Sequence, residues 1–170
     1  MKTLLVFTGG GLAPALNPTI YGVVTEACAK GWRVLGGLHG WSALLQGGRQ
    51  VELTNLNLEP LKENGGTILR SSRVNPYATA DGPATVRARI QELGIDAVVA
   101  IGGDDTLGAA ARLAQEGVPI VGIPKTVDND LPGTYFTPGF PSAAYYLANF
   151  EEEIKRDAAY ALSRIYIIEA

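Results

Sequence analysis

The chain has 170 residues, of which 46% are hydrophobic and 18% are charged, a balance that fits one compact globular domain and excludes a disordered or fibrous protein. Its formal net charge of -3 gives no general attraction for nucleic acid or for an anionic membrane surface, so neither is expected as a partner. A single cysteine and a single histidine argue against a disulfide and against a zinc site, and they fit a cytoplasmic protein.

Short β-rich runs alternate along the chain with longer stretches of helical periodicity. Strands are predicted at Thr3–Thr8, Arg33–Leu38, Thr67–Leu69, Asp96–Ile101, Val118–Ile123 and Arg164–Ile168. Helices are predicted at Asn17–Lys30, Trp41–Gln46, Gly82–Leu93, Thr106–Gln115 and Pro141–Leu162. Left-handed residues that end helices are expected at Gly31, Gly94 and Gly117. This order predicts an α/β fold of the doubly wound type, with a mostly parallel sheet covered by helices on both faces.

Acidic side chains follow two of the predicted strands at the point where each strand ends. Asp104 and Asp105 come after the run that ends at Ile101, and Asp128 and Asp130 follow the next strand along the chain. Because the carboxyl ends of parallel strands meet at one edge of a sheet, these side chains are expected to share a crevice. Carboxylates gathered in this way suit a divalent metal, phosphate groups and proton transfer.

Each of these residues also has a structural interpretation. Asp105 and Thr106 are equally suited to cap the helix that follows them. Residues 126–130 could form an Asx-turn network, and Lys125 is either a surface amine or a phosphate clamp.

Two glycine-containing segments are candidates for phosphate binding. Gly9–Gly11 lie between the first strand and its helix, where backbone N–H groups can approach an anion, although a tight turn would need the same glycines. Arg70 and Arg73 follow a second glycine pair, and the guanidinium of Arg73 could hold a phosphoryl group. The alternative is a solvated arginine pair on a loop.

Two further features lie near the end of the sequence. The aromatic side chains of Tyr145, Tyr146 and Phe150 are expected in core or interface packing. The run Arg164–Ile168 is typical of a buried strand, yet no turn or helix comes after it, which suggests the first part of a longer polypeptide.

Taken together and in this order, four motifs resemble the 6-phosphofructokinase family. They are the glycine-rich first turn, Gly-Gly-Thr-Ile-Leu with Ser-x-Arg downstream, Gly-Gly-Asp, and Thr-x-Asp-Asn-Asp. Because the family's subunits are about twice as long, the chain looks like the amino-terminal half of one. The resemblance implies that residues 1–140 form the domain that binds the phosphate donor. Residues 141–170 would be a connecting helix and the first strand of a domain that binds fructose 6-phosphate.

The resemblance also implies a reaction, the Mg²⁺-dependent transfer of a phosphoryl group to the 1-hydroxyl of fructose 6-phosphate. Asp128 matches the general base, Asp104 the Mg²⁺ ligand, and Thr126 a group that hydrogen-bonds near the transferred phosphoryl. Arg73 would assist catalysis as charge spreads over the phosphoryl oxygens. The donor would be held by Gly11, Arg73, Gly103, Asp105 and Lys125. The acceptor would be held by Thr126, Asp128, Asp130 and Arg164.

Two residues bear on which donor is used. Members that use ATP typically carry glycine where this chain has Asp105 and Lys125, so the chain resembles the pyrophosphate-using members. The Asp105 carboxylate would repel an α-phosphate, while the Lys125 ammonium can neutralise the end of a compact diphosphate. The chain departs from the family's usual pattern at Leu12 and at Arg70, and the latter would add positive charge beside the donor.

Three alternatives stay open: an ATP-dependent 6-phosphofructokinase, a kinase of the NAD-kinase type, and a fragment that binds phosphate without catalysis. The resemblance further implies a homo-oligomer, because Arg164 matches an arginine that reaches the sugar phosphate of a neighbouring subunit.

Overall fold

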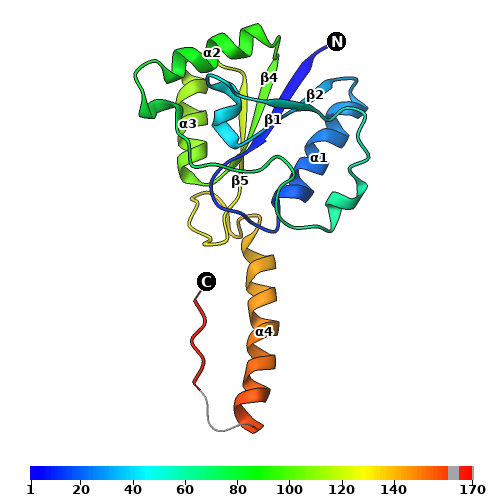
Figure 1. Ribbon diagram of the computed structural model, residues 1–170, viewed down its shortest axis with the longest axis vertical. Helices are drawn as coiled ribbons and strands as arrows, with labels where there is room; N and C mark the ends of the chain where they lie inside the picture. Colours follow the sequence, from blue (N-terminus) through cyan, green and yellow to red (C-terminus); the bar gives the residue numbers. More distant parts are fainter. Residues whose placement is uncertain (161–164, 170) are drawn as a thin grey trace.

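The computed structural model describes residues 1–160 and 165–169, and its centre is a five-stranded sheet in the order β3-β2-β1-β4-β5 (Figure 1). The parallel strands are β1 (Thr3–Thr8), β2 (Arg33–Gly37), β4 (Ala97–Gly102) and β5 (Ile120–Pro124), and β3 (Gln50–Glu52) runs antiparallel beside β2. The predicted doubly wound, mostly parallel sheet is therefore confirmed.

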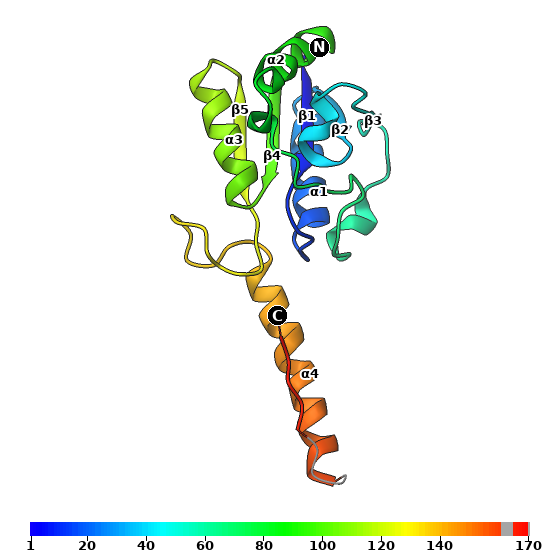
Figure 2. The same ribbon diagram turned by 60° about the vertical axis from the view of Figure 1, so that its left-hand side comes forward.

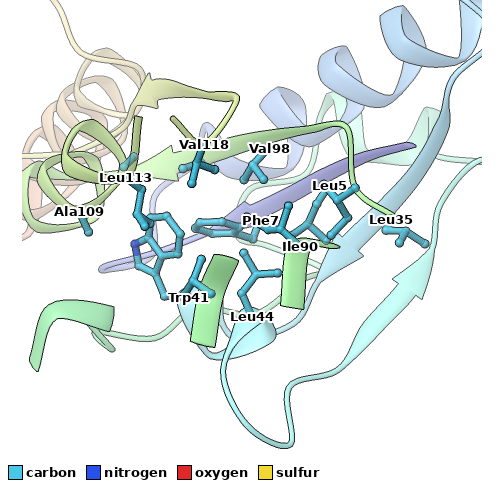
Figure 3. Packing of buried hydrophobic residues seen from close by; sticks show 14 residues of the cluster. Leu5, Phe7, Leu35, Trp41, Leu44, Ile90, Val98, Ala109, Leu113 and Val118 are labelled. Carbon is cyan, nitrogen blue, oxygen red and sulfur yellow. The ribbon is translucent and has the colours of Figure 1, made fainter. Parts of the chain in front are cut away.

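Helices cover both faces of this sheet. The helix α1 (Leu16–Ala29) packs on the face that carries Leu4 and Val6 of β1. The helices α2 (Gly82–Glu92) and α3 (Asp104–Gln115) pack on the opposite face. There Leu5 and Phe7 are fully buried (Figure 3), and the Phe7 ring lies 4.6 Å from that of Trp41 between centroids. Every residue of β1 is buried because both sides of it are covered, which explains its uninterrupted apolar sequence.

The turns that end the helices agree with the sequence pattern. Gly31, Gly94 and Gly117 have φ angles of 75°, 61° and 90°, the left-handed conformation expected of them. Short 3-10 helices occupy the connections: η1 (Gly40–Leu44), η2 (Glu59–Lys62) and η3 (Pro76–Ala78). The predicted helix at Trp41–Gln46 corresponds to η1, which is shorter and begins one residue earlier.

The predicted strand at Thr67–Leu69 is wrong, since these residues form a turn in which the Arg70 N–H donates to the Thr67 carbonyl. The Thr67 hydroxyl also accepts a hydrogen bond from the Leu69 N–H, so local bonds replace a strand ladder. The strand β3, which the sequence did not indicate, takes the edge position beside β2. It has only three residues, too few for a readable alternation.

The long helix α4 (Phe140–Tyr160) projects away from the sheet (Figures 1 and 2), and none of its described residues is buried. Tyr145 and Tyr146 are 74% and 71% exposed, and Phe150 is also exposed, so they do not lie in the core of this chain. Their packing in an interface stays a prediction. The predicted end of this helix lies outside the described residues.

The predicted strand at Arg164–Ile168 is also wrong for its described part. Residues 165–168 pair with no strand and instead run beside α4 (Figures 1 and 2), with Tyr166 hydrogen-bonded to Asp157. A strand needs a neighbouring strand to satisfy its backbone, and the described chain places none there. Within the described residues, no helix is both long and apolar enough to cross a membrane.

Candidate functional site

A cavity of 340 Å³ opens where the carboxyl ends of β4 and β5 meet the loop after β1. It is lined by Gly10, Gly11, Leu12, Arg73, Gly103, Asp104, Lys125, Thr126, Val127, Asp128 and Asp130. A smaller cavity of 170 Å³ shares four of these residues and adds Asp105 and Thr106. The two cavities thus bring together every predicted site residue except Arg164, which lies outside the described residues.

The loop after β1 forms one wall, and its conformation depends on glycine. Gly10 has φ of 79°, and a side chain there would also meet the Lys125 ammonium 3.3 Å away. Gly9 donates its N–H to the Ile101 carbonyl at 2.8 Å, which draws the loop over the end of β4. Gly11 is exposed, with open space where a side chain would be. The backbone of this loop is therefore accessible to a ligand in the cavity.

Helix α3 begins at Asp104, two residues earlier than the sequence pattern predicts, and its N-cap position is Gly103. Neither Asp105 nor Thr106 caps it, so that interpretation of the two residues is wrong. Thr106 instead lies buried against Gly9 and Gly102, where any added side chain would collide with it. Asp104 and Asp105 occupy the first helical turn, where the helix dipole favours negative charge.

Lys125 is only 4% exposed, which excludes the surface-amine interpretation. Its backbone N–H continues the strand ladder by donating to the Gly102 carbonyl, and its Nζ donates to the Gly11 carbonyl at 2.6 Å. Burial lowers the pKa of the ammonium, Asp128 raises it, and Arg73 lowers it further. The cavity wall therefore contains a desolvated cation whose Nζ has one hydrogen-bond partner among the residues that the structure describes.

The segment that carries Arg73 is held by polar side chains that the sequence analysis did not identify. Asn17 is 6% exposed, its Oδ1 accepts from the Ile68 N–H at 2.8 Å, and its Nδ2 donates to the Gly65 carbonyl at 2.9 Å. The buried Thr8 hydroxyl donates to the Arg70 carbonyl at 2.7 Å. The sequence feature that could have indicated this support is the asparagine at the start of an amphipathic helix. An asparagine there is equally typical of a residue that caps the helix end.

Two serines then join this segment to the glycine loop. The Ser71 hydroxyl donates to the Gly10 carbonyl at 2.5 Å, and the Gly10 N–H donates to the Ser72 carbonyl at 2.9 Å. The Ser72 hydroxyl donates to the backbone of His39, which has a left-handed φ of 62°. Arg73 thus stands on a loop fixed at several points, whereas the exposed Arg70 lines neither cavity.

The segment after β5 contains the predicted Asx network. Asn129 has φ of 54°, its Oδ1 accepts from the Thr137 N–H at 2.9 Å, and its Nδ2 donates to the Tyr135 carbonyl at 3.1 Å. The Thr126 hydroxyl accepts from the Asp128 N–H at 3.1 Å. These bonds shape the loop through Asn129 and leave the carboxylates of Asp128 and Asp130 at the cavity wall.

The carboxylates at the cavity suit Mg²⁺ that is bound together with a phosphorylated ligand better than a metal ion enclosed by protein side chains alone. The described residues hold no group of three or more His, Cys, Asp or Glu side chains that could enclose a metal ion. Asp104 is exposed and lines the cavity together with Asp128 and Asp130. Mg²⁺ is commonly held by one or two carboxylates together with water and substrate phosphates, so this donor set suits Mg²⁺ bound along with a phosphorylated ligand.

The fold and the cavity define a doubly wound α/β protein with a site suited to phosphate groups at the carboxyl edge of its sheet. The chain belongs to the phosphofructokinase family, because the family model described as Phosphofructokinase matches residues 3–170.

Relatives named for two different donors resemble the chain equally well. It is 41% identical over 157 residues to the pyrophosphate–fructose 6-phosphate 1-phosphotransferase of Amycolatopsis methanolica, covering 90% of this chain and 45% of that protein. It is also 41% identical over 170 residues to the ATP-dependent 6-phosphofructokinase 1 of Thermus thermophilus, covering 99% of this chain and 52% of that protein. The chain thus spans about half the length of the curated relatives that it matches.

Solved structures support the fold. The pyrophosphate-dependent phosphofructokinase of Nitrosospira multiformis matches with a TM-score of 0.81 at 27% identity, over 93% of this chain and 42% of that one. The phosphofructokinase of Saccharomyces cerevisiae matches with a TM-score of 0.82 at 26% identity, over 93% of this chain and 24% of that one.

Proposed function

We propose that the protein is a phosphofructokinase that transfers a phosphoryl group from diphosphate to the 1-hydroxyl of fructose 6-phosphate. The observation that carries the choice of donor is the buried ammonium of Lys125 in a cavity of only 340 Å³. A compact anion of high charge density compensates a desolvated cation best, because its charge lies within reach of the ammonium. Arg73 and the open backbone at Gly11 extend the same binding surface.

Asp105 supports the same choice of donor. Asp105 lines the smaller cavity beside Arg73 and Gly103, and we infer that a donor longer than diphosphate would extend into this cavity from the larger one. A nucleotide would bring a third phosphate near this carboxylate, and like charges at short range repel each other. Diphosphate ends before it reaches that position.

In the proposed reaction, the 1-hydroxyl oxygen of the sugar attacks the terminal phosphorus of diphosphate. The new O–P bond forms as the bridging P–O bond breaks, inorganic phosphate leaves, and the Asp128 carboxylate accepts the hydroxyl proton. Thr126 and Arg73 orient the transferred group and stabilise the charge on its oxygens. Asp130 would help to position the acceptor beside Asp128.

The proposal includes Mg²⁺, which Asp104 would hold. When bound, the ion neutralises charge on the donor phosphates. Asp104 is suited to this because it is exposed and lines both cavities.

The proposal assigns residues 1–140 to donor binding and residues 141–170 to the start of the region that binds the sugar phosphate. The arrangement of α4, which leaves the sheet and buries none of its described residues, supports a boundary at its beginning. Arg164 is proposed to contact the sugar phosphate of a second subunit, which makes the active protein a homo-oligomer.

A second candidate is the same transfer from ATP. It is favoured by the Thermus thermophilus relative, whose identity to this chain equals that of the Amycolatopsis methanolica relative. The residues at the cavity, and not overall similarity, therefore have to decide between the two donors.

The test measures the rate of fructose 1,6-bisphosphate formation by the full-length protein with Mg²⁺ and either diphosphate or ATP. We expect kcat/KM for diphosphate to exceed that for ATP by at least about a hundredfold, equivalent to about 2.7 kcal/mol. A preference for ATP would overturn the donor assignment. Calorimetric titration with Mg²⁺ and diphosphate, then with fructose 6-phosphate, would identify a non-catalytic protein if the first bound and the second did not.

A further inference from the structure

Asn75 makes two hydrogen bonds that fix the direction of its side-chain amide. Its Oδ1 accepts from the Tyr77 N–H at 2.8 Å, which makes Asn75 the N-cap of η3. Its Nδ2 donates to Asp105 Oδ1 at 2.9 Å, across a gap of thirty residues in sequence. Because the oxygen is taken by a backbone N–H, only the NH₂ end of the amide faces the first turn of α3.

The short helix η3 is itself fastened to α3. The Tyr77 hydroxyl donates to Glu116 at 2.6 Å, and the Arg112 guanidinium lies 3.5 Å from the centre of the Tyr77 ring. Glu116 also pairs with Arg87 of α2. These contacts hold Tyr77, and with it the cap residue Asn75, at a constant position relative to α3.

Asp105 would otherwise be unconstrained. It is exposed on the first turn of a helix, and among the described residues the Asn75 amide is the one side chain that donates to its carboxylate. An exposed aspartate without such a partner samples several rotamers. The bond to Asn75 therefore selects one orientation of a charge that lines the smaller cavity.

We propose that Asn75 is a positioning residue for donor specificity, which holds the Asp105 carboxylate at the cavity wall so that it excludes a donor longer than diphosphate. This inference rests on the proposed function, because it assumes that Asp105 discriminates against nucleotides. A carboxylate held in place opposes an incoming phosphate over its whole approach, whereas a free one can rotate toward solvent.

The chain offers a substitution that separates this role from capping. Asn75→Ser keeps an oxygen that can accept from the Tyr77 N–H, since serine is a good N-cap residue, but its side chain is too short to reach Asp105. Asp105→Gly removes the carboxylate itself, and the double variant removes both partners. The full-length protein is used for all of them, with thermal unfolding to establish that each variant is folded.

Two quantities are measured at saturating fructose 6-phosphate and Mg²⁺: kcat/KM for diphosphate and for ATP, and the inhibition constant of a non-hydrolysable ATP analogue in the diphosphate reaction. We expect Asn75→Ser to lower this inhibition constant about fivefold, the net value of a typical hydrogen bond, with kcat for diphosphate unchanged. Asp105→Gly should lower it further. In the Asp105→Gly background, Asn75→Ser should have no additional effect.

The possible failures are distinguishable. If Asp105→Gly leaves nucleotide inhibition unchanged, the donor argument in the proposed function is wrong and the inference goes with it. If Asp105→Gly lowers the inhibition constant of the ATP analogue but Asn75→Ser does not, only the role of Asn75 is overturned. An equal effect of Asn75→Ser in both backgrounds would also overturn it, because Asn75 would then act through something other than Asp105.

Discussion

Replacing Lys125 by methionine should separate the stability of the protein from its affinity for diphosphate. The ammonium is 4% exposed, and desolvation of such a group costs several kcal/mol. Its hydrogen bond to the Gly11 carbonyl, at 2.6 Å, recovers about 1.5–3 kcal/mol. Methionine fills a similar volume without a charge, and the exposed Gly11 can bond to water instead. We therefore expect Lys125→Met to leave the free energy of unfolding unchanged or to raise it by about 1–2 kcal/mol.

The affinity for diphosphate should fall in the Lys125→Met variant. Loss of a buried charge that pairs with the ligand costs about 3 kcal/mol, so the Kd for diphosphate should rise about 150-fold. Calorimetric titration and thermal unfolding of the full-length protein measure the two effects. Lys30→Met is the matched control, because Lys30 lies at the exposed end of α1 in a surface pair with Glu26 and should alter neither quantity by more than about 1 kcal/mol. Destabilisation by Lys125→Met together with unchanged binding would refute the reasoning.

The same lysine predicts a dependence on pH. Because burial lowers the pKa of Lys125 in the folded protein, the unfolded chain binds more protons between the lowered and the ordinary pKa, and stability rises with pH there. An anion favours the protonated amine, so affinity for diphosphate should fall as pH rises through the lowered pKa. Both trends should begin below the ordinary titration range of lysine and should be absent from Lys125→Met. Identical pH profiles of the two proteins would contradict this assignment.

Three further substitutions test the site and its supports. Asp128→Ser should lower kcat about 10²–10⁴-fold with little change in unfolding temperature, because it removes the proposed base from an exposed position; a loss of less than tenfold would remove Asp128 from the mechanism. Asn17→Ala should destabilise the protein by about 2–3 kcal/mol in chemical unfolding, whereas Asn149→Ala on exposed α4 should not, and equal effects would argue against the proposed support of the loop. Gly9→Ala should cost about 1–3 kcal/mol because its methyl would collide with α3, while Gly108→Ala has open space and should be stabilising; the reverse order would contradict the packing.

The sheet and its cavity could be predicted from sequence because the controlling patterns are local. The run before Asp104 and the run before Lys125 each read as a strand without reference to the rest of the chain. Parallel pairing then follows from the helix between them, and it brings the two strand ends to one edge.

The supports of the cavity could not be predicted because they join residues that are far apart in sequence. Asn17 bonds to Ile68 fifty-one residues away, and this long-range contact holds as a turn a segment whose composition favours a strand. Nothing local distinguishes such an asparagine from one that ends a helix.

The burial of Lys125 shows how the two kinds of information combine. Its position directly after β5 can be predicted from the local sequence. Its exposure, in contrast, depends on the loop after β1, because Gly10 and Gly11 of that loop lie over the amine. That loop is in turn held by Ser71 and Ser72. Because the loop over the amine is itself held by this third segment, a change in either segment should alter both the pKa of Lys125 and the affinity for diphosphate. The proposed choice of donor is accordingly a property of the assembled loops, and the motif that contains the lysine determines only where the charge can be placed.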